Sequence, residues 1–186
     1  MRVFSVADVL DAETCTWVRG SMDSGARVPT EILRETIDVE RDARRAVDVD
    51  VPDEVIARVE SCLDAYRDDV AWFYGLSLHG REGAGFLRYA SGGFYGPHVD
   101  RAKVPSWPDA ARRAITVVLF LNSSCEAEAR GDFSGGRLRL FPSGVGGEAV
   151  EIIPRRGMLV AFPASMAHEV TPVSSGARDA VVDWYY

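Results

Sequence analysis

The chain has 186 residues, of which 47% are apolar and 26% are charged, as is typical of a folded globular protein. Its 21 Lys and Arg residues against 28 Asp and Glu residues give a net charge of −7, which argues against a nucleic-acid partner because a negative surface repels phosphates. The sequence has no apolar run near the ~20 residues of a membrane span and no signal-peptide core, so we expect a cytoplasmic protein with no membrane partner. Its three cysteines form no CxxC motif, so we expect no disulfide framework.

The pattern along the chain divides one domain, expected over residues 1–186, into two parts. Residues 1–80 carry apolar side chains at helical spacing, which predicts a helical lead-in. From about residue 84 the pattern changes to short β-branched segments separated by glycine and proline, which is typical of a sandwich or jelly roll. We therefore expect a mainly β fold over 84–186, with the N-terminal helices packed against the outside of one sheet.

Two helices are expected in the lead-in. The first would begin at a cap formed by Ser5 or Asp8, end near Met22 and bury a face that includes Trp17. The second would occupy 53–75, because a proline and two acidic residues open it in the favoured way.

Strands are expected throughout the second part, and one precedes the second helix. Alternating valines predict a strand over 45–51, whereas the mixed-sign block before it, which includes Arg44, predicts solvated surface. The long β-branched segment 114–122 predicts a strand buried on both faces. The other predicted strands are 84–89, 136–141, 150–153, 158–162, 168–173 and 178–186.

The first chemical signal is the segment FYGPHVD at 94–100. Side chains of an extended strand alternate between its faces, so His98 and Asp100 would point the same way. A histidine bonded to a nearby carboxylate is the commoner origin of such a pair, and a chance match occurs in on the order of one chain in four. This pair alone is therefore weak support for a functional site.

His168 supplies the third member of a candidate metal site. It opens a late predicted strand, whereas the remaining histidine, His79, lies in a glycine- and arginine-rich loop. Two histidines and one carboxylate form the facial triad that binds non-haem Fe(II) and leaves positions for other ligands. His98, Asp100 and His168 are therefore the candidate metal ligands.

A buried arginine is expected on the last strand. By strand parity, Arg178 shares a face with Ala180, Val182 and Trp184, so its guanidinium would face an apolar interior. A buried guanidinium needs an anion, which it binds through paired hydrogen bonds. That anion is either a protein carboxylate or the carboxylate of a ligand.

Together these residues resemble the 2-oxoglutarate and Fe(II)-dependent oxygenases, in particular their prolyl-4-hydroxylase-like branch. The resemblance rests on His98-x-Asp100, His168 and Arg178 and covers about residues 84–186. It extends to further segments in the same order: LRY at 87–89, FLN at 120–122, SGGRL at 134–138 and HEVTPV at 168–173. It implies a jelly-roll core of the double-stranded β-helix type.

The resemblance also implies a chemistry. Fe(II) would be held by His98, Asp100 and His168, and the distal carboxylate of 2-oxoglutarate would pair with Arg178. O2 would be a cosubstrate, with ascorbate as a candidate reductant, and 2-oxoglutarate would be converted to succinate while the substrate is hydroxylated. Further cosubstrate contacts implied by the resemblance are Tyr89, Thr116 and Trp184.

The expected substrate is an amino-acid side chain, proline-like, free or in a peptide or protein. Tyr95, Trp107 and Arg113 are candidates for substrate contact, and 101–113, which also carries Lys103, would form a loop at the mouth of the site. A hydroxylase that tailors a small natural product and a non-catalytic jelly-roll binding module are the alternatives. The sequence leaves the oligomeric state open.

Overall fold

The computed structural model describes residues 3–30, 43–102, 107–128 and 130–186. The elements of these segments, in chain order, are β1 (Phe4–Val6), α1 (Ala12–Ser24), β2 (Arg27–Pro29), β3 (Arg44–Arg45), β4 (Val47–Val49), α2 (Asp53–Tyr74), β5 (Gly85–Ala90), β6 (Phe94–His98), the 3-10 helix η1 (Pro108–Ala111), β7 (Ile115–Phe120), β8 (Phe133–Gly135), β9 (Leu138–Phe141), β10 (Val150–Ile152), β11 (Leu159–Pro163), β12 (Ala167–Val170) and β13 (Val173–Tyr185).

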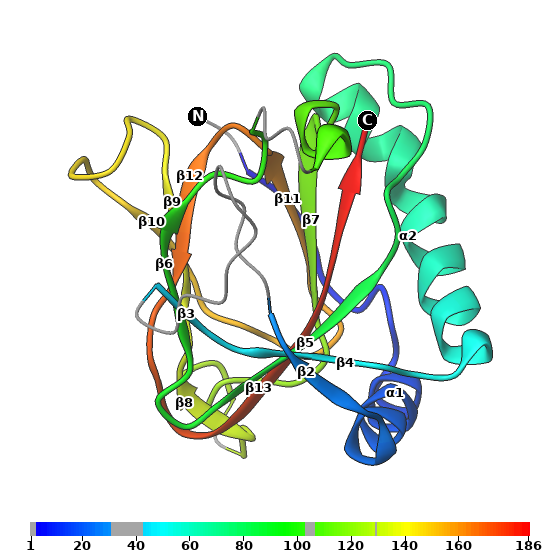
Figure 1. Ribbon diagram of the computed structural model, residues 1–186, viewed down its shortest axis with the longest axis vertical. Coiled ribbons are helices and arrows are strands. Elements are labelled where there is room, and N and C mark those ends of the chain that lie inside the picture. Colours follow the sequence, from blue (N-terminus) through cyan, green and yellow to red (C-terminus); the bar gives the residue numbers. More distant parts are fainter. Residues whose placement is uncertain (1–2, 31–42, 103–106, 129) are drawn as a thin grey trace.

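Two antiparallel sheets face each other, and α1 and α2 lie on the side of the larger sheet, away from the smaller one (Figure 1). The larger sheet has the strand order β1-β11-β7-β13-β5-β4-β2, with β8 also paired to β13. The smaller sheet has the order β10-β9-β12-β6-β3. This arrangement confirms the expected mainly β jelly roll with helices outside one sheet.

The second helix begins and ends as predicted. Pro52 precedes it, Asp53 and Glu54 occupy its first turn, and Gly75 ends it in the left-handed conformation with φ of 64°. Glycine adopts that conformation without the steric penalty that a Cβ atom brings, so it suits a helix C-terminus.

The predicted start of the first helix is wrong. Asp11 caps α1, because its carboxylate accepts a hydrogen bond from the backbone N–H of Thr14 at 2.7 Å. Ser5 lies instead in β1, which pairs with β11. Trp17 is 41% exposed, so the buried face of α1 does not include it.

The N-terminal part is also less helical than predicted. In its described residues it has four short strands besides two helices, and these strands extend both sheets: β1, β2 and β4 join the larger sheet and β3 joins the smaller one. The strand β4 lies within the strand predicted over 45–51, whereas β1, β2 and β3 have two or three residues each and were not recognised in the sequence.

The strand β7 lies at the centre of the core, and all six of its residues are buried, as predicted. Ile115, Val117 and Leu119 pack in the cluster that joins the larger sheet to the two helices. Val118 and Phe120 point to the other face and pack in a second cluster with residues of the smaller sheet. The inner face of β7 therefore borders the space between the sheets, where the site described below lies.

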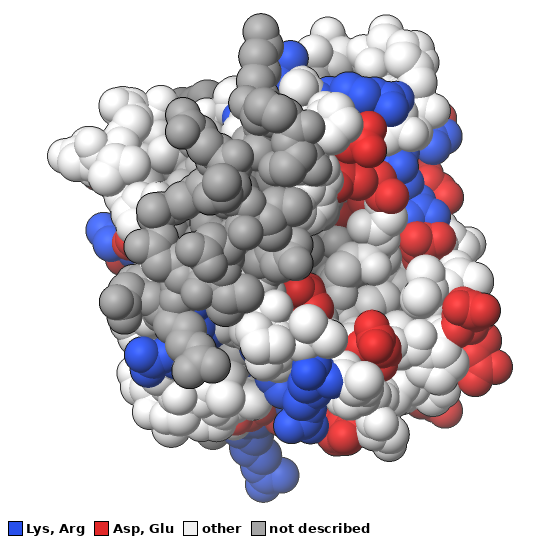
Figure 2. Space-filling view, viewed as in Figure 1, with Lys and Arg blue, Asp and Glu red and all other residues white. Residues whose placement is uncertain are grey.

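Acidic and basic side chains are interspersed on the face of the molecule drawn in Figure 2, over the side where α2 lies. Mixed signs of this kind are usual for a solvated helical face. In the described segments, no helix is long and apolar enough to cross a membrane.

Candidate active site

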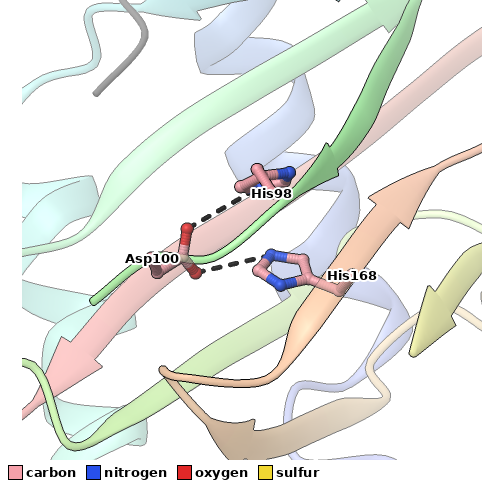
Figure 3. A group of neighbouring side chains, drawn as sticks. All are labelled: His98, Asp100 and His168. Atoms are coloured by element: carbon pink, nitrogen blue, oxygen red, sulfur yellow. Dashed lines mark ion pairs between the residues drawn. The ribbon is translucent and has the colours of Figure 1, made fainter. Parts of the chain in front are cut away.

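The three candidate metal ligands come together between two neighbouring strands of the smaller sheet (Figure 3). His98 ends β6, and it lies directly opposite His168 of β12 in the antiparallel register. Asp100 does not lie on the strand as predicted, since β6 ends at His98 and Asp100 belongs to the bend that follows. Its backbone N–H donates to the carbonyl of Ala164 at 3.0 Å, which holds this bend beside the start of β12.

The ligand atoms of the three residues all lie within 4.8 Å of one another. The Nε2 atom of His98 is 3.5 Å from one oxygen of Asp100, and the Nε2 atom of His168 is 3.5 Å from the other. A single ion placed between them would therefore be within reach of all three side chains.

The hydrogen bonds of the two histidines fix which ring nitrogens face Asp100. Nδ1 of His98 lies 2.8 Å from the carbonyl oxygen of Gly96, and Nδ1 of His168 lies 3.0 Å from that of Met166. A carbonyl only accepts, so each Nδ1 carries a proton and donates it there, and each ring turns its Nε2 atom toward the carboxylate. Two imidazole Nε2 atoms and a carboxylate thus converge, a ligand set that fits a divalent cation.

Electrostatics keep this set in the form that binds a metal. Burial, together with His98, lowers the pKa of His168 to about 4, so its imidazole is neutral near pH 7. Burial of Asp100 opposes its ionisation, but His168 and His98 outweigh that effect and hold its pKa well below the usual range. Asp100 is therefore a carboxylate rather than a carboxylic acid.

Two residues hold Asp100 in place. The hydroxyl of Thr116 donates to one of its carboxylate oxygens at 2.7 Å. The guanidinium of Arg113 donates to its backbone carbonyl at 3.2 Å, while two short hydrogen bonds of 2.6 Å and 2.5 Å bind that guanidinium to Glu82. Thr116, expected from the resemblance to contact the cosubstrate, thus lies against the metal set in this structure.

Arg178 lies on the face of β13 that was predicted, and its side chain is buried. Its guanidinium lies 5.0 Å from the ring centroid of Tyr89 and 5.1 Å from that of Phe120. Within the described segments its Nε atom has no hydrogen-bond partner and no carboxylate forms an ion pair with it. Burial lowers the pKa of Arg178, although an arginine stays charged near pH 7. This buried cation fits the carboxylate of a ligand.

The candidate metal ligands and Arg178 border one cavity of about 90 Å³ between the sheets. The predicted residues that line it are His98, Asp100, His168, Arg178, Tyr89, Thr116, Trp184, Tyr95, Trp107 and Arg113. Trp184 contributes a buried indole N–H that has no hydrogen-bond partner in the described part of the chain. The structure therefore brings all ten together, with apolar side chains such as Val118 and Leu138 between them.

The candidate substrate contacts differ in their surroundings. The ring of Tyr95 stacks on that of His98, with centroids 3.4 Å apart and planes 15° apart. Arg113 lies 3.5 Å from the ring centroid of Trp184, and its charge is matched by Glu82. Trp107 lines the cavity, whereas Lys103 lies outside the described residues.

Two charged residues of the site were missed from the sequence. Arg44 was assigned to solvated surface, which is wrong, because its side chain lines the cavity. Glu82 pairs with Arg113 from the segment before β5, and no motif marked it. No pattern in the sequence could have identified Arg44, because β3 has two residues and a period of two needs a longer strand.

A comparison with known protein families decides the assignment. The family described as the 2OG-Fe(II) oxygenase superfamily matches residues 84–186 of the 186 residues. The chain belongs to this superfamily. The range matched is the one over which the sequence resembles these oxygenases, so that prediction is confirmed. The superfamily is named for Fe(II) and 2-oxoglutarate. Fe(II) fits the cluster of His98, Asp100 and His168, and 2-oxoglutarate fits the buried Arg178. Ascorbate stays a prediction.

Relatives of this oxygenase include PKHD-type hydroxylases. One from Alteromonas mediterranea is 34% identical over 101 residues, which are 53% of this chain and 41% of the relative. One from Shewanella baltica is 29% identical over 183 residues, which are 98% of this chain and 71% of the relative. The oxygenase thus spans about two fifths of the length of the first relative.

Solved structures with the same fold include two prolyl hydroxylases. A prolyl-4-hydroxylase of Pseudomonas putida superposes with a TM-score of 0.70 at 24% identity, over 98% of this chain and 91% of that chain. A prolyl hydroxylase of Trichoplax adhaerens, solved with a peptide fragment of hypoxia inducible factor, gives 0.77 at 23% identity, over 99% and 83% of the two chains. These likenesses confirm that the oxygenase has the expected prolyl-4-hydroxylase-like fold.

Proposed function

We propose that this oxygenase hydroxylates an amino-acid side chain, proline-like, free or in a peptide or protein, and converts 2-oxoglutarate to succinate in the same reaction. One observation carries the proposal. A cluster of acceptors that fits a divalent cation borders the same cavity as a buried guanidinium that fits the carboxylate of a diacid. Sites of either kind occur alone in many proteins, whereas this cosubstrate needs both at once.

Each part of the site would have a separate task. Bound Fe(II) and 2-oxoglutarate would supply activation of O2 and the oxidation of the substrate C–H bond. His98, Asp100 and His168 would bind the metal from one side and leave its other positions for ligands. Arg178 would orient the cosubstrate through its distal carboxylate, and the apolar walls of the cavity would exclude water.

The substrate class is supported by the relatives. The two solved relatives are described as prolyl hydroxylases, and one of them was solved with a peptide. An amino-acid or peptide substrate is therefore the proposal for this chain as well. A cytoplasmic location is part of the same proposal, supported by free cysteines at 15, 62 and 125, since reduced thiols are usual there.

The experiment that tests the proposal measures succinate released from 2-oxoglutarate, together with equilibrium binding of Mn(II). We expect Fe(II)-dependent succinate release by the wild type, and loss of both succinate release and Mn(II) binding in His168→Ala. His79→Ala is the matched control, because His79 is exposed and lies outside the cavity, and it should keep both properties. Full succinate release by His168→Ala would refute the proposal.

A further inference from the structure

A half-buried arginine, Arg44, borders the cavity from the sheet opposite Arg178. Arg178 belongs to β13 of the larger sheet, whereas Arg44 belongs to β3, the edge strand of the smaller sheet. The guanidinium of Arg44 lies 4.5 Å from the ring centroid of Tyr95, and Tyr95 in turn stacks on His98. The three side chains form a column that ends at a candidate metal ligand.

Strand pairing explains why Arg44 points inward. In the antiparallel register, Arg44 is opposite Tyr95 and Arg45 is opposite Phe94. Successive residues of a strand point to opposite faces, so Arg44 follows Tyr95 into the cavity and Arg45 follows Phe94 away from it. Arg45 is exposed and lies 5.8 Å from the ring centroid of Phe94.

The surroundings of Arg44 favour its charged form. Burial disfavours the charge, but Tyr89, Tyr95 and Asp48 outweigh this effect and raise the pKa of Arg44. Stacking on Tyr95 uses the face of the guanidinium, whereas a carboxylate binds its N–H edge. Because a guanidinium has five N–H donors, contacts with protein neighbours and with a ligand carboxylate are compatible.

We propose that Arg44 binds a carboxylate of the primary substrate, so that this enzyme oxidises compounds that carry a carboxylate near the reacting carbon. The inference rests on the proposed function, in which Arg178 is already assigned to the distal carboxylate of 2-oxoglutarate. Among the described residues, Arg44 is the cavity-lining arginine of the smaller sheet, and its column with Tyr95 ends at the candidate metal ligand His98.

The carboxylate has two sources that the structure does not distinguish, a free amino acid and the C-terminus of a peptide. The test therefore uses matched probes: free standard L-amino acids with their carboxamides, and Ala-X-Ala peptides with free or amidated C-termini. Each is titrated into the anaerobic protein loaded with Mn(II) and 2-oxoglutarate. Binding is followed by tryptophan fluorescence, because Trp107 and Trp184 line the cavity.

We expect some free acids to bind the wild type at least about tenfold more tightly than their amides, as loss of a charged hydrogen bond implies. Arg44→Gln should remove that preference, and Arg44→Lys should keep part of it. Arg45→Gln is the matched control and should behave as the wild type. Free amino acids that bind when free-acid peptides do not would identify the first source, and the converse would identify the second.

Three outcomes would overturn the inference. Equal binding of acids and amides by the wild type would show that no carboxylate is recognised. A preference that persists in Arg44→Gln would place the recognition elsewhere. A loss of 2-oxoglutarate binding in Arg44→Gln, with no change in the acid preference, would assign Arg44 to the cosubstrate. If the wild type binds no 2-oxoglutarate at all, the proposed function fails and the inference fails with it.

Discussion

At the scale of single residues, Arg178 is the clearest sign that the site is built for a ligand. A buried cation that lacks a carboxylate partner destabilises a fold, and an apolar replacement of similar length would remove that cost. Contacts with the rings of Tyr89 and Phe120 offset only part of it. The charge is therefore explained by binding rather than by folding.

Arg178→Met should separate these two roles. We expect the ligand-free variant to gain about 1 kcal/mol in free energy of unfolding, because a desolvated charge is removed. The same variant should lose about 10- to 100-fold in affinity for 2-oxoglutarate, because a charged hydrogen-bond donor is removed. Urea unfolding and calorimetric titration measure the two quantities. A variant that is less stable and binds 2-oxoglutarate normally would show that Arg178 is structural.

The neutral state of His168 should make the stability of the metal-free protein depend on pH. Its pKa is about 4 in the folded protein against an ordinary 6.5, so between these values the unfolded chain binds more protons. The free energy of unfolding should therefore fall as the pH falls from about 6.5 to 4, by on the order of 3 kcal/mol, and stay flat above that window. Asp100 does not add to this slope, since its pKa lies below the window.

Urea unfolding at pH 7 and pH 4.5 measures this dependence. His168→Gln should reduce the difference between the two pH values, while His79→Gln should leave it as in the wild type. An unchanged difference in His168→Gln would assign the pH dependence to other groups.

At the scale of elements, one face of β13 carries residues of the site, and its other face carries buried aspartates that hold the fold together. Its inward face carries Arg178 and Trp184, while Asp179 and Asp183 are fully buried on the outward face. Asp179 accepts hydrogen bonds from Arg88 at 2.6 Å and 2.9 Å and from Arg19 of α1 at 2.9 Å. One carboxylate thus ties a helix to two strands of the larger sheet.

Asp179→Ala should be among the most destabilising single changes in this chain. It would leave the guanidinium of Arg88 without its main partner, and breaking a buried pair in this way costs about 3–5 kcal/mol. Arg19→Ala removes a more exposed partner and should cost about 1 kcal/mol. Urea unfolding of both variants compares the costs, and equal values would show that Asp179 is not the centre of the network.

How much of this could be read from the sequence differs between elements. The strand β7, the helix α2 and the part of β13 after residue 177 were predicted because each is long enough for its period to be recognised, whereas the start of β13 at Val173 was assigned to the preceding strand. The parity of β13 also placed Arg178 and Trp184 correctly on one face. The short strand β3 has two residues, so no period could show that Arg44 points inward. The pairing of Arg113 with Glu82 depends on tertiary contact and left no local signal.

At the scale of the whole molecule, stability should be highest where the two core clusters meet. The six residues of β7 are all buried, and the strand lies between β11 and β13. Opening of its hydrogen bonds therefore requires global unfolding.

Hydrogen exchange can test this distribution. Amides of β7 should exchange most slowly in the metal-free protein, at a rate set by the global free energy of unfolding. Addition of Mn(II) and 2-oxoglutarate should slow exchange at the end of β6 and in β12 by mass action on the folded state. Faster exchange in β7 than in β5 would contradict this description of the core.

The alternation of β13 also limits how the chain can change in length. Insertion or deletion of one residue between 178 and 184 would make the residues on one side of the change point to the opposite face of the sheet. Asp179 or Asp183 would then point into the cavity, and Arg178 or Trp184 would point away from it. The protein would lose both its contact with the ligand and the ion pairs that hold α1 against the sheet. Length variation in homologous chains should therefore fall outside this interval.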